Sequence, residues 1–462
     1  MENIRIQDDL YTFVNQAKLD ELVIPDDMPV AGGFAALGTD VEKLMIGEFN
    51  DMCASASYPN EHMANACTLY QLAKDVKRKK KHGIKPALKN LAILKKLGTM
   101  RRFNLRTKEL MLRGISLPLD IGVSANMKDT THHCVMISGP GVILPDASYY
   151  GEGREQQKEM MLNLWTGFAK QVLTIAGHTE QECDDLLKDT LAFDALLAKY
   201  VKSQEEWSEY TKMYNPMKTG RVAGMVKPFN LKKLLTDIFG FIPEELIVTE
   251  PRFFKNFKEI FNAETFEIYK SWAYVTTLMG SCSLLTEELR DLGGAFRRAI
   301  SGIAANSSAE KFAYQLASGL YSEPVGLFYG EKYFGEEAKK DITEIVKQIV
   351  ATYQKRIETN DILEPATKEK AILKLSKMGL KMAYPDRVEP LYDKLVFDET
   401  KSLFEIVATL KKIRMEENLA KLSKEVDRTH WAMPGHMVNA CYDPFVNDIT
   451  FPAAIQIGRA HV

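Results

Sequence analysis

Apolar residues recur at helical spacing through the middle of this chain, and this periodicity limits its fold more than any other feature. A face from Met161 to Ile175 ends before Gly177, a residue that suits the left-handed position after a helix. Thr179 and Glu182 then have the spacing of a capping box for the next helix. These patterns predict a mainly helical body from about residue 41 to about residue 385. The clearest apolar face, opposite a charged one, consists of Ile342, Ile345, Val346, Ile349, Val350, Tyr353 and Ile357.

Strand patterns are few and short. Apolar runs at 135–137 and 142–144 flank a Ser-Gly-Pro-Gly turn cluster. Apolar and polar residues alternate at 438–442 and again at 448–451, which predicts a β-hairpin with a longer loop. The change from helical to strand pattern after Pro385 indicates a domain boundary. Before residue 41, prolines and a Gly-Gly pair disfavour helix, so an extended N-terminal arm is predicted.

The composition excludes several classes of protein. The chain has 462 residues, of which 45% are hydrophobic and 26% charged, as in ordinary soluble proteins. With a net charge of −2 it has no bulk attraction to nucleic acid or to an anionic membrane. No apolar run reaches the roughly 18 residues of a membrane span, and no secretory signal is visible. The six cysteines are far apart, so free thiols in a cytoplasmic protein are predicted.

No common catalytic motif occurs in the sequence. The metallopeptidase motif His-Glu-x-x-His is absent, as are the serine-hydrolase elbow and the nucleotide-binding glycine motifs. His132 and His133 are adjacent and would point to opposite faces of a strand, so they are predicted to be loop or strand-edge residues. His430 and His436 could meet across a turn, but no carboxylate or cysteine at suitable spacing completes a site. The sequence therefore predicts no catalytic and no metal-ligating residues.

The basic run at 77–82 has two interpretations. It could contact nucleic acid or an acidic partner. It could also be the solvated end of a helix that begins near Asn65, where cations suit the helix dipole. The second interpretation is preferred, because a single basic run on a neutral chain is a weak footprint for nucleic acid.

The segment 438–442 offers a way to hold a peptide. The Asn439 side chain has one acceptor and two donors, so it can pair with the N–H and C=O groups of a peptide together. On an exposed strand edge it could hold an extended peptide as an added strand, and Ala440 would keep that edge uncrowded. An ordinary hairpin with an outward asparagine remains the alternative.

A series of short motifs gives this segment a context. In their order and in their residues these motifs resemble those of the neprilysin family of zinc metalloendopeptidases, of the bacterial cytosolic endopeptidase O type. They include Leu-Pro-Asp-Ala-Ser-Tyr-Tyr, Tyr-Asn-Pro-Met and Phe-Pro-Ala-Ala-Ile. The matching segments are 8–15, 24–27, 144–150, 214–217, 327–334, 367–371, 384–386, 426–428 with Trp431, 438–442 and 451–455.

The resemblance implies a large helical lobe that caps a thermolysin-like α+β catalytic lobe around a cavity admitting only peptides. Residues 1–40 would be an arm returning to the catalytic lobe, 41–386 the helical lid, and 387–455 the incomplete start of the catalytic domain. The family's Asn-Ala pair, which binds the substrate backbone, falls on Asn439 and Ala440. Cys441 stands where the family has an aromatic residue, and Gln71 where it has the arginine that grips a substrate carboxylate.

The family's zinc ligands and general base lie downstream of the segment 451–455 and have no counterpart here. The chain is therefore predicted to be an inactive fragment of a zinc enzyme that cleaves internal bonds of short peptides, and to bind no zinc at the family site. Residues 456–462 read like one frame of a sequencing adapter, so a non-native tail is predicted. The alternative is a catalytically dead helical protein that binds peptides or another partner. Peptides, rather than nucleic acid or membranes, are the expected partners.

Overall fold

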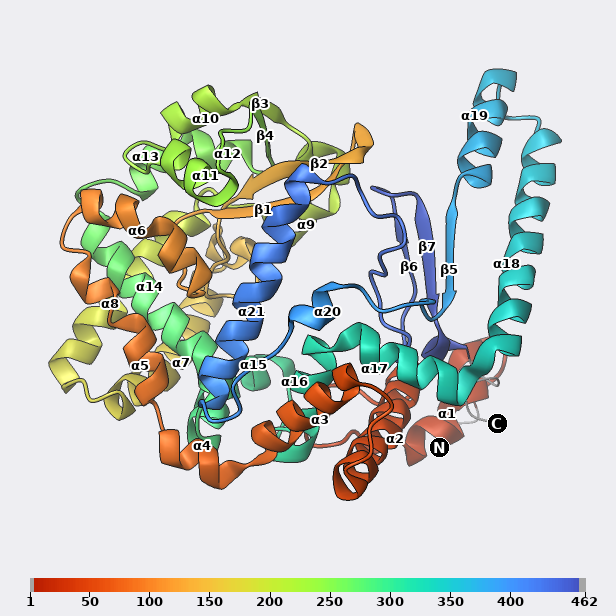
Figure 1. Cartoon of the computed structure of the whole chain (residues 1–462), viewed down its shortest axis with the longest axis horizontal. Coiled ribbons are helices and arrows are strands. Elements are labelled where there is room, and N and C mark those ends of the chain that lie inside the picture. The colour runs from red at the N-terminus through yellow and green to blue at the C-terminus, as the bar shows by residue number, and fades with distance from the viewer. Residues whose placement is uncertain (1–3, 457–462) are drawn as a thin grey trace.

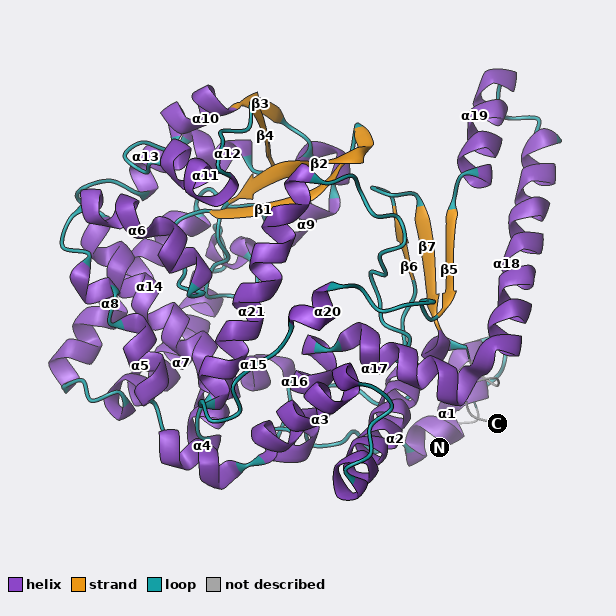
Figure 2. Ribbon diagram, viewed as in Figure 1, coloured by secondary structure: helices purple, strands orange, loops and turns teal. Residues whose placement is uncertain are grey.

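The structure is a computed structural model that describes residues 4–456. It is mainly helical, as predicted, with strands confined to two small sheets (Figure 2). Most helices form one broad mass. The second sheet lies at one side of this mass, beside the helical pair α18 (Gly335–Glu358) and α19 (Pro365–Ser376) (Figure 1). No helix in the described part of the chain is long and apolar enough to cross a bilayer. The predicted tail at 456–462 lies, except for Gln456, outside the described residues.

The helices are distributed along the whole described chain. The first ten are α1 (Leu10–Glu21), α2 (Gly33–Ser55), α3 (Glu61–Lys74), α4 (Val76–His82), α5 (Lys85–Leu91), α6 (Met100–Leu112), α7 (Glu155–Ile175), α8 (Glu180–Ala198), α9 (Gln204–Ser208) and α10 (Thr219–Met225). The others are α11 (Leu231–Phe239), α12 (Pro251–Lys255), α13 (Phe257–Ile260), α14 (Phe266–Ser281), α15 (Glu287–Ser301), α16 (Ala309–Leu320), α17 (Ser322–Tyr329), α18 (Gly335–Glu358), α19 (Pro365–Ser376), α20 (Leu391–Lys394) and α21 (Leu403–Ala420).

Two of these helices form where the periodicity predicted them. Helix α7 buries Trp165 and Val172, and the capping box between Thr179 and Glu182 begins α8. Helix α8 packs against α14 around a cluster of aromatic rings with edge-on contacts. Tyr269 of α14 is fully buried there, with its ring centre 5.5 Å from that of Phe193. This cluster forms the core of the broad helical mass.

The first sheet has the strand order β1-β2-β4-β3, with β1 (Asp120–Asn126), β2 (Asp129–Ser138), β3 (Pro216–Lys218) and β4 (Glu245–Val248). Strand β2 contains the predicted run 135–137, but its hairpin partner is the preceding strand β1. The run at 142–144 is not a strand. Its backbone donors bond to side chains, because the Ile143 N–H donates to Asp194 (3.0 Å) and the Leu144 N–H to the hydroxyl of Tyr150 (3.3 Å).

The second sheet has the order β5-β7-β6, with β5 (Gly379–Ala383), β6 (Cys441–Asp443) and β7 (Asp448–Pro452). The predicted C-terminal hairpin is confirmed, since β6 and β7 pair antiparallel. Strand β5 pairs parallel with β7 and comes from a segment some seventy residues earlier, so Gly379 lies opposite Asp448. The carboxylate of Asp448 is 2% exposed and is bound by Lys381 and Arg428. The sheet therefore contains a buried charged cluster on the strand that joins its edges.

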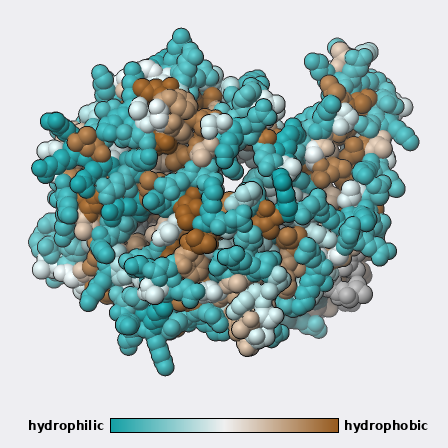
Figure 3. Space-filling model, viewed as in Figure 1, coloured by the Kyte–Doolittle hydropathy of each residue, from teal (hydrophilic) through white to brown (hydrophobic). Residues whose placement is uncertain are grey.

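Helix α18 forms where the clearest periodicity predicted it, but its apolar face is not buried. No residue of the helix is buried, and Ile349 and Tyr353 are 49% and 59% exposed. The pair α18 and α19 contacts little besides each other and β5. Hydrophobic side chains are visible on the surface in this region (Figure 3). Periodicity indicated a helix with one apolar face, but it does not indicate what covers that face.

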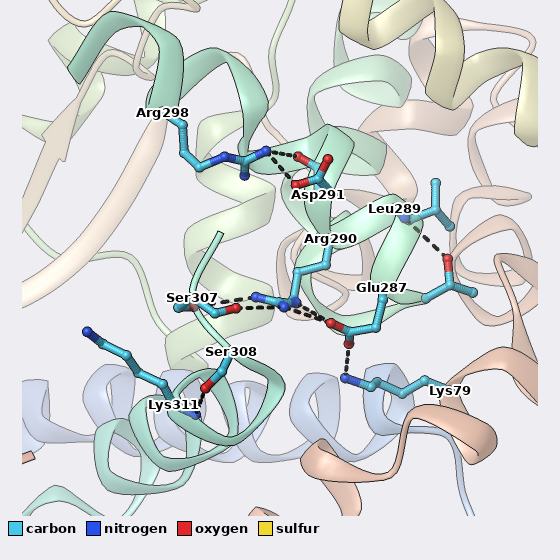
Figure 4. A network of polar contacts seen from close by, with 10 residues as sticks. Lys79, Glu287, Leu289, Arg290, Asp291, Arg298, Ser307, Ser308 and Lys311 are labelled. Carbon is cyan, nitrogen blue, oxygen red and sulfur yellow. Dashed lines mark hydrogen bonds and ion pairs between the residues drawn. The ribbon is translucent and has the colours of Figure 1, made fainter. Parts of the chain in front are cut away.

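The basic run is a helix end with mostly exposed cations, as predicted, but the helix is not the expected one. It forms a separate short helix, α4, which Asp75 caps by accepting from the Arg78 N–H, and it does not extend a helix from Asn65. Lys79 points inward, with a side chain only 1% exposed, and binds Glu287 of α15. Glu287 also accepts from Arg290 at 2.7 Å, so one carboxylate joins two buried cations (Figure 4). The inward lysine explains why the run is not simply a solvated helix end.

The N-terminal segment is not extended throughout. Helix α1 begins after Asp9, whose side chain accepts from the Thr12 N–H at 2.9 Å. Helix α2 begins at Gly33, inside the Gly-Gly pair that was expected to resist helix. A capping carboxylate and a glycine able to adopt a positive φ start these two helices and offset the local resistance. The division into an arm, a lid and a catalytic start remains a prediction.

Candidate functional site

A cavity of about 740 Å³ lies between the two sheets. Strands β1 and β2 contribute one wall, α17, α20 and α21 contribute others, and β5 to β7 close the remaining side. Charged residues dominate much of the lining, and they come from segments far apart in the sequence. The charged and titratable lining residues include Glu323, Lys381, Glu389, Arg414, His430 and Asp448.

Asn439 and Ala440 lie immediately before β6, which is an outer strand of its sheet. Asn439 is exposed and Ala440 is half-buried. The side-chain oxygen of Asn439 accepts from the Ala440 N–H at 2.8 Å, and no described residue is hydrogen-bonded to its amide nitrogen. The outer edge of β6 pairs with no other strand among residues 4–456. The predicted pair thus lies beside a free strand edge, with a donor available.

The position of this segment is fixed by a close contact between two glycine backbones. A Cβ atom on Gly326 of α17 would lie 2.5 Å from the nitrogen of Gly435, closer than real Cβ contacts come. A Cβ on Gly435 would in turn lie 2.5 Å from the oxygen of Gly326. The Gly435 carbonyl also accepts from the Ala454 N–H at 3.0 Å. Helix α17 and the helical turn Ala453–Ile455 that follows β7 therefore hold the loop that leads to Asn439 from two sides.

Three potential ligands meet in the cavity that the sequence did not bring together. Glu323 of α17, Glu389 beside α20 and His430 place their ligand atoms within 4.8 Å of one another. His430 binds Glu389 through Nδ1. The sequence hypothesis paired His430 with His436 and found no carboxylate or cysteine at a spacing that completes a site. Glu389 is 66 positions from Glu323 and 41 positions from His430. Local spacing in the sequence therefore gave no indication that the three residues meet.

The other predicted positions have ordinary surroundings. His132 and His133, predicted to be loop or strand-edge residues, lie on the inner strand β2, where His132 is exposed and His133 half-buried. They make separate contacts, to Asp129 and to the Lys424 carbonyl. Gln71 is exposed on α3. All six cysteines are free thiols. Of these predicted positions only His133 lines the cavity, and none belongs to the group of Glu323, Glu389 and His430.

His436 is outside the ligand group, and its buried ring Nδ1 has no hydrogen-bond partner among the described residues. Burial lowers the pKa of His436 to about 4 from its usual 6.5. Between these values the unfolded chain binds a proton that the folded chain does not. His436 is therefore expected to lower the free energy of unfolding by about 2 kcal/mol as the pH falls from 7 to 5, while buried carboxyl groups with raised pKa values, such as Asp194, contribute in the opposite direction.

Urea denaturation at both pH values, of the native chain and of His436→Gln, measures this contribution. Buried carboxyl groups such as Asp194 titrate in both proteins and cancel in the comparison. The variant should lose about 2 kcal/mol less than the native chain over this interval. Equal losses in the two proteins would show that His436 does not control the acid response.

Comparison with known proteins explains the arrangement. Residues 6–385 match the model of the N-terminal part of peptidase family M13. The chain belongs to peptidase family M13. It is 35% identical over 455 residues to a neutral endopeptidase of Lactobacillus helveticus, covering 98% of this chain and 70% of that protein.

Solved structures of M13 peptidases agree with the fold. The crystal structure of PEPO from Lactobacillus rhamnosis matches with a TM-score of 0.93 at 30% identity, over 99% of this chain and 72% of that one. The inhibitor complex of the zinc metalloprotease ZMP1 from Mycobacterium tuberculosis matches with a TM-score of 0.89 at 25% identity, over 100% of this chain and 70% of that one. The chain is thus a homologue of M13 zinc metalloendopeptidases.

The residues present do not fit the zinc site expected from the family resemblance. That site needs two histidines of His-Glu-x-x-His, and none of the eight histidines of the 462-residue sequence is in this motif. The charged lining of the cavity instead includes the mixed group of Glu323, Glu389 and His430. No catalytic step through the family's zinc can therefore be assigned to residues of this chain.

Proposed function

We propose that this chain forms the peptide-enclosing part of a cytoplasmic zinc metalloendopeptidase that cleaves internal bonds of short peptides. We also propose that the 462 residues alone do not cleave peptides. The observation that carries the proposal is the combination of M13 membership with a large cavity and a free strand edge beside Asn439. The second statement is supported by the absence of the His-Glu-x-x-His motif from the sequence.

In this proposal a peptide binds as an added strand along the outer edge of β6. Main-chain hydrogen bonds along that edge would hold peptides of varied sequence. The amide nitrogen of Asn439 would donate to a peptide carbonyl, and its oxygen would accept a peptide N–H in place of that of Ala440. The small side chain of Ala440 leaves the neighbouring backbone accessible. Asn439 and Ala440 are thus the proposed substrate-binding residues.

The open apolar faces support the same proposal. Helices α1 and α18 carry exposed side chains such as Phe13, Val14 and Tyr353, at 55%, 64% and 59% exposure. The chain spans 70% of the length of the Lactobacillus helveticus endopeptidase. In the proposed arrangement these faces are where a catalytic part of the family fold packs, since exposed apolar surface of this extent marks an interaction site.

A cleavage assay tests the proposed inactivity. The 462-residue chain is incubated with internally quenched peptides and added zinc, with and without a chelator, beside an active zinc endopeptidase as positive control. We expect no chelator-sensitive cleavage. Zinc-dependent turnover that scales with the concentration of this chain would contradict the proposal.

Peptide affinity tests the binding mode separately. We expect Asn439→Ala to weaken binding of a short fluorescent peptide about tenfold, because two hydrogen bonds of about 0.7 kcal/mol each are lost. Asn163→Ala is the matched control, since Asn163 is an exposed asparagine on α7. Equal affinities for Asn439→Ala and the native chain would exclude the proposed role. Fluorescence anisotropy measures both variants.

A catalytically dead peptide-binding protein is the second candidate function, favoured by the intact cavity in a sequence without the zinc motif. Both candidates give peptide binding without cleavage by the 462-residue chain. Genomic sequence after the codon for Ile455 separates them. A reading frame that continues into His-Glu-x-x-His supports the peptidase, and a stop codon after Val462 supports the binding protein.

A further inference from the structure

We infer that Glu323, Glu389 and His430 form a binding site for a divalent transition-metal ion in the cavity, separate from the zinc site of the family. The three side chains come from α17, from the residue two before α20, and from the loop that precedes β6. Their ligand atoms all lie within 4.8 Å of one another. To bind a single ion at ordinary ligand distances, the hydrogen-bonded pair of His430 and Glu389 has to open and the carboxylate of Glu323 has to approach.

The carboxylate of Glu323 is the strongest indication of a missing ligand. The residue is only 5% exposed, and one of its oxygens accepts from the Glu389 N–H at 2.9 Å. No described residue makes a hydrogen bond to the other oxygen, although the residue lines the cavity. Burial raises the pKa of Glu323, which means that its charged form has lost hydration without full replacement. A bound cation would supply the missing interaction.

The charge around this group also favours a cation. Two carboxylates face one imidazole, so with a neutral histidine the group carries two negative charges. Arg414 is nearby, but its guanidinium donates to the Leu320 carbonyl and lies over the ring of Tyr392 at 5.4 Å. It forms no ion pair with Glu323 or Glu389. Through space and without an ion pair, Arg414 favours the charged form of Glu323 and Lys421 that of Glu389. Burial still keeps the pKa of Glu323 raised.

The ligand types indicate which ions would bind. Two carboxylate oxygens and one imidazole nitrogen suit Zn²⁺ and its neighbours such as Co²⁺ and Mn²⁺. Mg²⁺ and Ca²⁺ prefer oxygen ligands alone. The ion would take the Nδ1 atom of His430 and an oxygen of Glu389, which now bind each other. The cavity of about 740 Å³ leaves room for water molecules to complete the coordination.

The inference does not depend on the proposed peptidase function, because its test measures metal binding to this chain. The 462-residue protein is stripped with chelator, and binding of Zn²⁺ is measured by calorimetry, with Co²⁺ absorption as a spectroscopic check of the coordination. We expect one equivalent of metal to bind. Loss of a ligand in Glu389→Gln or His430→Ala should weaken the affinity by more than about 100-fold, the upper range for loss of a supporting residue.

His132→Ala is the matched control. His132 is also bonded through Nδ1 to a carboxylate, that of Asp129, at 2.7 Å, but it is exposed and has no second carboxylate. The His430 side chain is 48% exposed, so its removal should leave the fold intact, and circular dichroism checks this. Absence of stoichiometric binding would overturn the inference, as would equal affinities for the native chain and His430→Ala. Loss of binding in His132→Ala alone would overturn it as well.

Discussion

Replacing Glu287 with glutamine is expected to lower the free energy of unfolding by about 3 kcal/mol, because it leaves the ammonium group of Lys79 buried without a counter-charge. The Lys79 side chain is 1% exposed, and the Glu287 carboxylate is its ion-pair partner. The nearby ring of Phe312, with its centre 5.4 Å from Nζ, offers only a weak cation–π contact. Urea denaturation measures the loss.

Two further variants separate a buried charge from a general effect of substitution. Glu344→Gln removes one partner of an ion pair whose side chains are 56% and 61% exposed, and it should change stability by less than about 0.5 kcal/mol. The double variant Lys79→Met with Glu287→Gln also removes the buried charge of Lys79, and it should recover the part of the loss that Lys79 causes, whereas Arg290 still lacks its carboxylate partner. Equal destabilisation by the single and double variants would show that the charge of Lys79 is not the cause.

The second large effect is expected from Gly326→Ala. A methyl group there would lie 2.5 Å from the nitrogen of Gly435, so α17 and the loop before Asn439 would have to separate. We expect a loss of about 2–3 kcal/mol in the free energy of unfolding, in the range of overpacked sites. The displaced loop should also weaken peptide binding, because Asn439 follows Gly435 by four residues.

Gly47→Ala is the control for helix propensity. Gly47 lies inside α2, and an added Cβ would meet nothing within 4 Å. The same substitution there should stabilise the protein by about 0.5–1 kcal/mol. If urea denaturation shows that Gly326→Ala destabilises the protein and Gly47→Ala stabilises it, the close contact is established as the cause. If Gly326→Ala stabilised the protein, the loop at Gly435 would be shown to move aside without a loss in the free energy of unfolding.

Local sequence patterns predicted those parts of the fold that depend on neighbouring residues. The capping box of Thr179 and Glu182 and the hairpin of β6 and β7 are examples. The patterns failed where contacts with a distant segment of the chain determine the local structure. Lys79 is buried because Glu287, 208 positions away, faces it. The run at 142–144 is not a strand because Asp194 and Tyr150 bind its backbone donors.

The candidate site divides in the same way. The sequence pattern placed Asn439 and Ala440 on a strand, but β6 begins only at Cys441, so both residues lie just before it. The group of Glu323, Glu389 and His430 had no local signal, because each residue belongs to a different element of the cavity wall. The packing of α17 against the loop at Gly435 and the hydrogen bond from the Glu389 N–H to Glu323 bring them together.

The free edge of β6 has a consequence for how selective the protein can be and for its behaviour in solution. The strand has three residues, which span roughly 10 Å, and Pro444 follows it without an N–H group. Such an edge can form hydrogen bonds with the main chain of only a few residues of a bound peptide. It therefore tolerates diverse peptide sequences but gives modest affinity. Because the strand is so short, its edge does not support the edge-to-edge strand pairing between molecules that would lead to fibres.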